Sequence, residues 1–312
     1  MKQGLITVKR SDSLDAALKV LSTNDISSCP VIDPKLGCMG LVDMFDIVDY
    51  LLSMVLKQSE HTGGKTMGLS FYKLNLDPVS VVINQANDVE TMCPVVTESD
   101  NVYSLIQLFT IGCHRVPVYA STDAAARGVP RLSRIISQTD LAVWLWQDAR
   151  IKERIAKCPY LAGNIQNPNP KSVSQSTPTV EVMKLLHENK ISSVAVVDDK
   201  GKLKNEISTD SWKGMNEKNI DTILDDVKGF LKSKAKREKD GKKRKLFTCS
   251  PDTPIQEVWQ TIVTNRYHRV WVVSDGNKLV GVISLVDLLK ALVMLIGNDI
   301  NNVRDIGGEQ QL

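Results

Sequence analysis

The sequence predicts an α/β protein built from four similar repeats, each with the order strand, helix, strand, strand, helix. In every repeat, apolar residues at helical spacing precede a short strand rich in Val and Ile, a turn and a further strand. From the start of the helical pattern to the mouth of the next strand is thirteen residues in two repeats and fourteen in the other two. A unit of about 50 residues is too small to bury a good core alone, so we expect the repeats to pack in pairs.

The repeats are expected at 1–57, 91–150, 169–230 and 246–300. Between them we expect a linker with a helix-forming segment at 58–90, a linker at 151–168 and a basic linker at 231–245, with a C-terminal tail at 301–312. Nine Lys or Arg residues among 232–245 are typical of a solvated, mobile segment. A nuclear-targeting signal is the alternative interpretation of that segment.

Within a repeat, the elements follow from local patterns. The helical segment of the first repeat has its apolar residues at Ala17, Val20 and Leu21, and Asp33-Pro34 then predicts a turn between two strands. The other repeats show the same sequence of signals, with turn residues at 198–201 and 274–277 in the third and fourth repeats. In the second repeat the two strands are separated by an insertion around 121–131.

The composition is that of a soluble globular protein, with 42% apolar and 24% charged residues in 312. A net charge of +3 does not indicate a nucleic-acid-binding protein. The six cysteines form no C-x-x-C pair, so neither a zinc site nor a disulfide framework is expected. We find no apolar signal region and no membrane span, and expect a cytoplasmic protein that contacts no membrane.

The fourth repeat has two polar features beside its apolar strands. His268 and Arg269 open a strand that continues as Val-Trp-Val-Val, and Ser284 and Asp287 stand where the next strand passes into a helix. Ser and Asp are favoured helix caps, so the second feature alone indicates only a cap. A pair of basic residues at the mouth of a buried strand is more often solvated than part of a binding site.

The second repeat has both features again, with His114 and Arg115 at a strand mouth and Ser137 and Asp140 at a helix start. This coincidence in two repeats favours a binding site over independent helix caps. We find no nucleophile with a neighbouring base and no catalytic constellation, so we do not expect an enzyme.

The layout of strand, helix, "PVVD"-like strand, turn, "GVISLVD"-like strand and helix resembles the cystathionine-β-synthase (CBS) domain. Two CBS domains form a Bateman module. Four in one chain resemble the gamma regulatory subunit of AMP-activated protein kinase and its fungal and plant relatives. The resemblance implies two Bateman modules facing each other in a flattened disc, with adenine nucleotides bound in clefts between paired repeats.

The resemblance also implies roles for individual residues. The helix-start Asp binds the ribose hydroxyls, the preceding Ser supports it, the basic residues at the strand mouths bind phosphates, and a Thr at the strand start contacts the base or sugar. Charge-assisted hydrogen bonds suit both the hydroxyls and the phosphates. Carried over to this sequence, the nucleotide-binding residues are Asp287, Ser284, Thr248, His268, Arg269, Asp140, Ser137, His114, Arg115, Asp46 and Thr7.

Two repeats depart from this pattern. The first has Asp43 where Ser or Thr is usual, and its strand mouth carries Ser27 and no basic residue. In the third, Asp210 stands one place before Ser211, which occupies the position that the spacing assigns to the Asp. We therefore expect no nucleotide site built on Asp210.

The function expected from the resemblance is that of a non-catalytic energy sensor. AMP, ADP and ATP would compete for the sites, no metal cofactor is indicated, and the partners would be kinase catalytic and beta-type subunits. Self-association is a further option. Only about four residues precede the first strand, whereas gamma subunits carry a segment there that helps to bind the beta subunit. The alternatives are a stand-alone CBS-repeat protein that binds an adenosyl ligand and regulates another enzyme, and an interaction scaffold without ligand.

Overall fold

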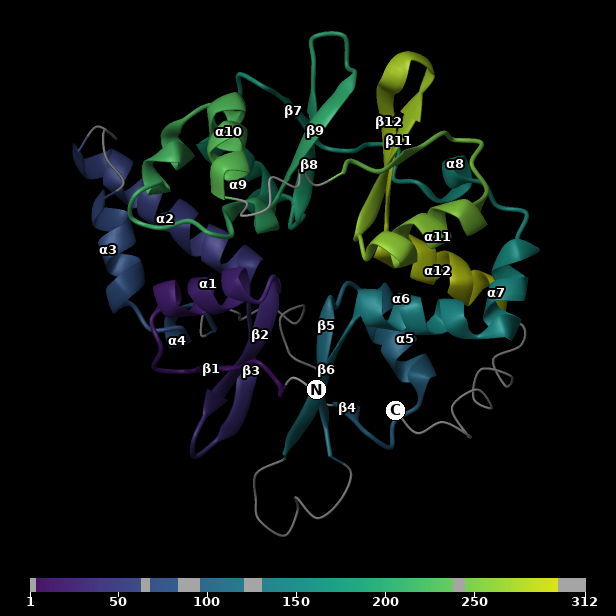
Figure 1. Ribbon diagram of the computed structural model, residues 1–312, viewed down its shortest axis with the longest axis horizontal. Coiled ribbons are helices and arrows are strands. Elements are labelled where there is room, and N and C mark those ends of the chain that lie inside the picture. Colours follow the sequence, from purple (N-terminus) through teal and green to yellow (C-terminus); the bar gives the residue numbers. More distant parts are fainter. Residues whose placement is uncertain (1–3, 63–67, 84–95, 121–130, 238–244, 297–312) are drawn as a thin grey trace. The chain divides into compact units, whose positions relative to one another are not determined.

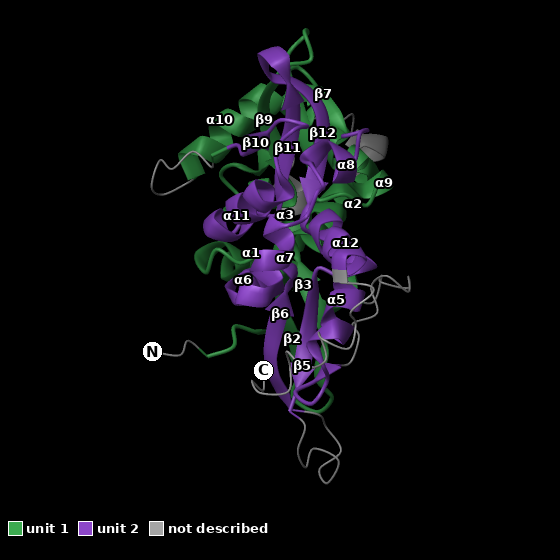
Figure 2. Cartoon of the chain, turned by 90° about the vertical axis from the view of Figure 1, so that its right-hand side faces the viewer, with its two compact units in different colours: residues 1–87, 171–245 green, residues 88–170, 246–312 purple. Residues whose placement is uncertain are grey.

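The computed structural model describes residues 4–62, 68–83, 96–120, 131–237 and 245–296 (Figure 1). The chain divides into two compact units, one of residues 1–87 and 171–245, the other of residues 88–170 and 246–312 (Figure 2). The first unit therefore joins the first and third repeats, and the second unit joins the second and fourth. The repeats pair as expected for a small α/β element, but the partners within each unit are not consecutive in sequence.

The first unit contains the elements of the first repeat and those that follow it: β1 Val8–Lys9, α1 Leu14–Thr23, β2 Ser28–Asp33, β3 Gly37–Asp43, α2 Met44–Thr62, α3 Gly68–Leu76 and α4 Ser80–Ile83. From the third repeat it contains β7 Ser172–Ser174, α9 Thr179–Glu188, β8 Ser193–Val197, β9 Leu203–Ser208, the 3₁₀ turns η3 Thr209–Trp212 and η4 Ile220–Leu224, and α10 Val227–Arg237.

The second unit contains β4 Val96–Thr97, α5 Val102–Thr110, β5 Arg115–Tyr119, β6 Leu132–Ser137, α6 Gln138–Gln147, α7 Ala149–Ala156 and α8 Ala162–Ile165. From the fourth repeat it contains β10 Thr248–Cys249, α11 Ile255–Asn265, β11 Arg269–Ser274, the 3₁₀ turn η5 Asp275–Asn277, β12 Lys278–Ser284 and α12 Leu285–Ile296.

Each repeat forms its own three-stranded sheet, and the four sheets share one topology. The strands lie in chain order, with the first pair parallel and the second pair antiparallel. The antiparallel pairs are interrupted at the same place, after the fourth residue pair from the strand mouth: Val31/Ile32, Val118/Tyr119, Val196/Val197 and Val272/Val273. The predicted fold of four CBS-like α/β repeats is confirmed by this agreement.

One element of the predicted repeat pattern is wrong. The third repeat was expected to end in a helix like the others, but η3 is a single 3₁₀ turn of 4 residues, whereas α2, α6 and α12 have 19, 10 and 12. The chain then turns at Gly214, which has a positive φ of 74°. Glycine adopts this conformation without a steric penalty, and the Asn residues that follow favour turns over helix interiors.

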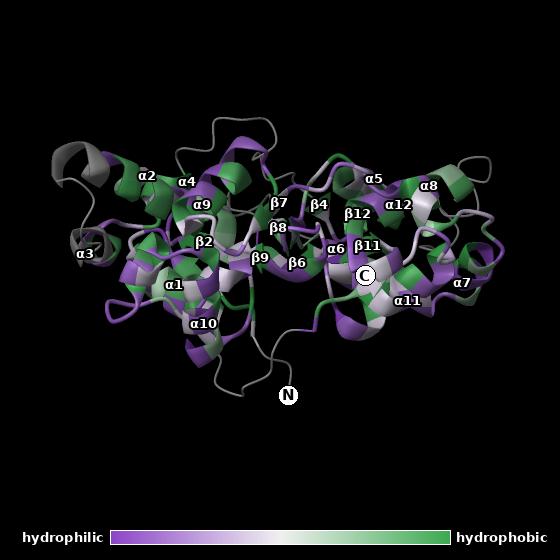
Figure 3. Ribbon diagram, turned by 90° about the horizontal axis from the view of Figure 1, so that it is seen from above, coloured by the Kyte–Doolittle hydropathy of each residue, from purple (hydrophilic) through white to green (hydrophobic). Residues whose placement is uncertain are grey.

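The helices form because they have an apolar face, and in several of them a side chain satisfies one of the first amide groups. Ser13 caps α1 by accepting a hydrogen bond from the Ala16 amide at 3.2 Å, and Asn101 does the same for α5 with Ser104 at 2.9 Å. The helical ribbons accordingly change between hydrophobic and hydrophilic colours along their length (Figure 3). Amphipathic helices of this kind are stabilised mainly by burying the apolar face.

Each unit has its own hydrophobic core, to which both of its repeats contribute. In the first unit, Leu51 of α2 and Leu186 of α9 are fully buried in one cluster. In the second, Leu145 of α6, Trp259 of α11 and Leu288 of α12 are buried in another. The helices at the junction of the repeats thus close the core that a single repeat cannot close.

The segments expected as linkers contain more structure than a linker needs. Within 151–168, Ile151 and Ile155 of α7 and Ala162 of α8 are buried in the core of the second unit, because the amphipathic pattern continues past the second repeat. Helix α10 extends into the expected basic linker 231–245, of which 238–244 lie outside the described residues, as does the expected tail at 301–312. The repeat boundaries themselves stay predictions. No described helix has the length and apolar character to span a membrane.

Candidate nucleotide site

The sheet register brings each strand mouth to the start of the following helix. In the fourth repeat Arg269 pairs with Ser284, and in the second repeat Arg115 pairs with Ser137. The first amide of α12 also donates to the His268 carbonyl, with Leu285 N and His268 O 3.1 Å apart. The predicted proximity of basic residues and helix start is therefore present in both repeats, while the role of these residues in binding stays a prediction.

In the fourth repeat, Ser284 and Asp287 form a capping box. Asp287 Oδ2 accepts from Ser284 N at 2.8 Å and from Ser284 Oγ at 2.6 Å, and Asp287 N donates to Ser284 Oγ at 3.4 Å. Among the described residues no hydrogen bond reaches Asp287 Oδ1. Arg269 is buried and His268 exposed. The carboxylate is thus held in place by one oxygen, and its other oxygen can accept from a ligand hydroxyl.

The second repeat has the same capping box but a different second contact. Ser137 Oγ donates to Asp140 Oδ2 at 2.6 Å, and Arg266 Nη2 of the paired fourth repeat donates to Asp140 Oδ1 at 2.8 Å. The Arg266 and Asp140 side chains are 63% and 49% exposed. His114, also predicted here, is exposed at the strand mouth. Both oxygens of Asp140 are therefore engaged by protein groups.

Arg266 is not among the residues predicted from the sequence, although its position in the repeat could have indicated it. It ends α11 in the left-handed conformation with a φ of 48°. The same position in the other repeats is held by Asp25, Gly112 and Lys190, two residues before the strand-mouth residue that aligns with His268. The residue at this one position therefore differs in charge among the four repeats.

In the first repeat two carboxylates replace the Ser and Asp. Asp43 Oδ1 accepts from Asp46 N at 2.9 Å, and Asp46 Oδ2 accepts from Asp43 N at 2.8 Å. Burial, followed by the negative charge of Asp43, raises the pKa of Asp46 well above the ordinary value. A protonated carboxyl at this position has an O–H donor that a carboxylate lacks.

The third repeat places Ser211 at the position of Asp287, as the residue count predicts. Ser208 N donates to Ser211 Oγ at 3.1 Å, which is the capping contact that Asp287 makes in the fourth repeat. Asp210 instead accepts a hydrogen bond from Ser27 Oγ of the first repeat at 2.7 Å. Asp210 therefore lies in a contact between repeats, and the expectation that it forms no nucleotide site stays a prediction.

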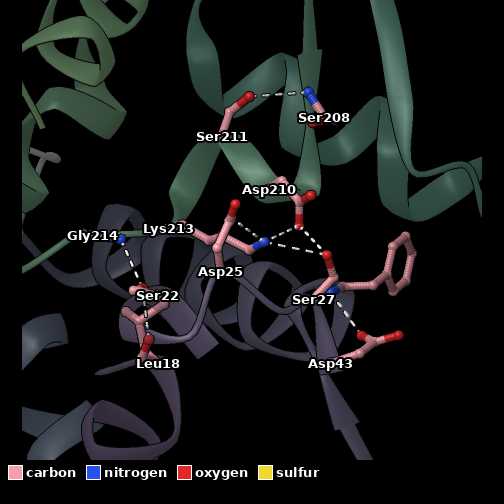
Figure 4. Close-up of polar contacts among 11 residues, drawn as sticks. Leu18, Ser22, Asp25, Ser27, Asp43, Ser208, Asp210, Ser211, Lys213 and Gly214 are labelled. Atoms are coloured by element: carbon pink, nitrogen blue, oxygen red, sulfur yellow. Dashed lines mark hydrogen bonds and ion pairs between the residues drawn. The ribbon is translucent and has the colours of Figure 1, made fainter. Parts of the chain in front are cut away.

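Lys213 completes this contact between the first and third repeats (Figure 4). Its Nζ lies 3.3 Å from oxygens of Asp210, Asp25 and Ser27. Nearby, the Gly214 amide donates to Ser22 Oγ at 2.9 Å. The Lys213 and Asp210 side chains are each only 11% exposed, so the group is a partly buried, charged link within the first unit.

The remaining predicted residues lie at the edges of their sheets. Thr248 is in β10, opposite Trp271 of the next strand, and Thr7 immediately precedes β1; both are exposed. A further contact between repeats, not predicted, joins His187 Nδ1 of α9 to Asp49 Oδ1 of α2 at 2.7 Å. In the described ranges no group of three or more His, Cys, Asp or Glu residues could hold a metal ion.

Comparison with protein families identifies three of the repeats directly. The family model of the CBS domain matches residues 1–53, 162–210 and 242–294. The second repeat lies outside these matches, and its identification rests on the sheet of β4, β5 and β6, which has the topology and bulge position of the other three.

The relatives agree with this result over nearly the whole chain. The gamma subunit of 5'-AMP-activated protein kinase from Saccharomyces cerevisiae is 23% identical over 300 residues, which cover 93% of this chain and 87% of that protein. Protein SDS23 of Meyerozyma guilliermondii is 23% identical over 308 residues, covering 88% of this chain and 55% of that protein.

A solved structure shows the same fold. Protein MJ1225 of Methanocaldococcus jannaschii, proposed to be an archaeal homolog of the kinase's gamma subunit, superimposes with a TM-score of 0.69 at 16% identity, covering 93% of this chain and 96% of that one. The chain is therefore a CBS-repeat protein, and it resembles the gamma subunit of AMP-activated protein kinase.

Proposed function

We propose that the chain is a non-catalytic, adenine-nucleotide-binding regulatory subunit of a complex like AMP-activated protein kinase. The observation that carries the proposal is the similarity to the yeast gamma subunit, which spans 93% of this chain and 87% of the relative. Kinase catalytic and beta-type subunits are the partners, and the cytoplasm is the location. AMP, ADP and ATP compete for the sites, and the bound nucleotide biases how the chain holds the kinase.

The fourth repeat supplies the principal site of this proposal. Asp287 accepts the ribose hydroxyls, Ser284 holds its carboxylate in place, and His268 with Arg269 contacts the phosphates. The Arg269 guanidinium is a planar cation whose N–H groups suit phosphate oxygens, and the His268 imidazole is a second cation when it is protonated. AMP, ADP and ATP carry different phosphate charge, so they differ in affinity for these cations, and a switch requires such a difference.

A second candidate function is favoured by the similarity to SDS23, which covers 88% of this chain. In that case the chain binds an adenosine-containing ligand outside a kinase complex and regulates another protein. Affinity purification of the tagged chain from cells separates the two candidates. Recovery of a kinase catalytic subunit in stoichiometric amount supports the first, and its absence from a nucleotide-binding preparation supports the second.

The proposal of nucleotide binding is tested by thermal unfolding with millimolar AMP, ADP or ATP. A ligand at 100 times its dissociation constant adds about 2.7 kcal/mol to the stability. We expect a rise in the unfolding midpoint of the wild type, which Asp287→Asn reduces. The matched control is Asp148→Asn, because Asp148 also caps a helix of the second unit, accepting from Arg150 N at 2.9 Å. A midpoint unchanged by every nucleotide would overturn the proposal and favour a ligand-free scaffold.

A further inference from the structure

In the second unit, the residue that ends the first helix of the fourth repeat contacts the helix-start carboxylate of the second repeat. In the second unit α11 packs on α6, and Arg266, at the end of α11, reaches Asp140 at the start of α6. The reciprocal packing is α5 on α12. Here the residue after α5 is followed by Gly112, which aligns with Arg266 and has no side chain to offer Asp287.

The first unit has a charged contact of the same kind with the signs reversed. Asp25 occupies the position of Arg266, and its carboxylate lies 3.3 Å from Lys213 Nζ of the paired repeat. Around Gly112, by contrast, a Cβ atom would find no other atom within 4 Å. The fourth and first repeats thus extend a charged side chain to their partner, whereas Gly112 of the second repeat has no side chain to extend.

We propose that Arg266 is an internal competitor for the Asp140 carboxylate, so that the nucleotide site of the second repeat fills only when this arginine is displaced. The inference rests on the proposed function. A ribose hydroxyl must donate to Asp140 Oδ1, which already accepts from Arg266 at 2.8 Å, while Oδ2 is held by Ser137. In the described part of the chain no arginine contacts the second oxygen of Asp287, so the fourth repeat binds the nucleotide first.

The expected change in nucleotide affinity follows from how exposed the ion pair of Arg266 and Asp140 is. With side chains 63% and 49% exposed, the ion pair is of the weak, solvent-screened kind. Its removal should therefore tighten binding at the second repeat by roughly two- to fivefold. High salt screens exposed charges, so the difference between wild type and variant should shrink as the salt concentration rises.

The test uses equilibrium dialysis of the full chain to measure the dissociation constants of radiolabelled AMP and adenosine. The Asp287→Asn background removes the fourth-repeat site, and the change that Arg266→Gln adds to it reports on the second repeat, where Arg266 contacts Asp140. The matched control is Arg150→Gln, which removes an arginine that is 62% exposed and paired with Asp148 in the same unit. Adenosine is included because it has no phosphate: a competitor hinders both ligands, whereas a phosphate-binding arginine helps only AMP.

We expect Arg266→Gln to lower the dissociation constants of both ligands in the Asp287→Asn background, and Arg150→Gln to leave them unchanged. Weaker AMP binding with unchanged adenosine binding would overturn the inference, because Arg266 would then be a phosphate ligand. Unchanged dissociation constants in Arg266→Gln would overturn the inference as well. So would a loss of all binding in Asp287→Asn that Arg266→Gln does not restore. The proposed function survives each of these results. Absence of binding to the wild type refutes both.

Discussion

Replacing Lys213 with Met tests whether the charged contact of the first unit holds its two repeats together. Methionine keeps the apolar stem of the side chain and removes the ammonium group that contacts Asp210, Asp25 and Ser27 (Figure 4). Asp210 then keeps the hydrogen bond from Ser27 but loses its Lys213 partner, while remaining 11% exposed.

The magnitude follows from burial and distance. Removal of one partner of a buried ion pair costs about 3–5 kcal/mol, because the other charge stays desolvated. The contacts of Lys213 are 3.3 Å long, which exceeds the length of strong charge-assisted bonds, and Asp25 is 80% exposed. We therefore expect Lys213→Met to cost about 2–3 kcal/mol, or about 4–12 °C in the unfolding midpoint of a unit this size.

The assay is thermal unfolding followed by circular dichroism, with two comparison variants. Lys157→Met removes an exposed lysine whose pair with Glu153 has side chains 74% and 63% exposed, and it should change the midpoint little. Adding Asp210→Asn to Lys213→Met removes the desolvated charge and should recover most of the loss. A midpoint change for Lys213→Met no larger than that for Lys157→Met would refute the reasoning.

Two further predictions concern ionisable groups. Burial raises the pKa of Asp46, so the protonated form of this carboxyl stabilises the folded state. The stabilisation is complete below the pKa of the unfolded chain, about 4, and it is lost as the pH rises through the raised pKa of the folded chain. Asp46→Asn should therefore raise the unfolding midpoint at pH 7.5 and change it little near pH 4; an equal shift at both would contradict this. Burial also raises the pKa of Cys249 to about 11, so its alkylation at pH 7.5, followed by mass spectrometry, should be at least ~100-fold slower in the folded chain than after denaturation; equal rates would contradict it.

The repeat fold could be predicted because its signals are local. Apolar residues at helical spacing, turn residues and strands rich in Val and Ile all lie within about 50 residues, and they recur four times in register. The capping box of Ser284 and Asp287 is likewise a spacing of three residues. The helix expected directly after β9 is replaced by a short 3₁₀ turn, since Gly214 and the Asn residues behind it outweigh the repeat pattern.

The pairing of repeats could not be predicted, because it depends on contacts between distant parts of the chain. Arg266 and Asp140 are 126 residues apart, and Lys213 and Ser27 are 186 apart. No local pattern indicates that the first repeat packs with the third. The charged residues that decide which carboxylates remain open were therefore missed, although their equivalent positions could be aligned.

The four helix starts differ in what already occupies them, and this difference bears on function more than the shared motif does. Asp210 is held by Ser27 and Lys213, Asp46 by Asp43 in a pair that favours protonation, and Asp140 by Arg266. Asp287 keeps one oxygen without a hydrogen bond in the described part of the chain and, unlike Asp46, has a serine and no second carboxylate in its capping box. Breaking existing contacts costs binding free energy, so we expect a hydroxyl-bearing ligand to bind most tightly at Asp287. The repeats thus share one fold but differ in the contacts at their helix starts, and we expect their affinities for a ligand to differ through single residues such as Gly112 and Arg266.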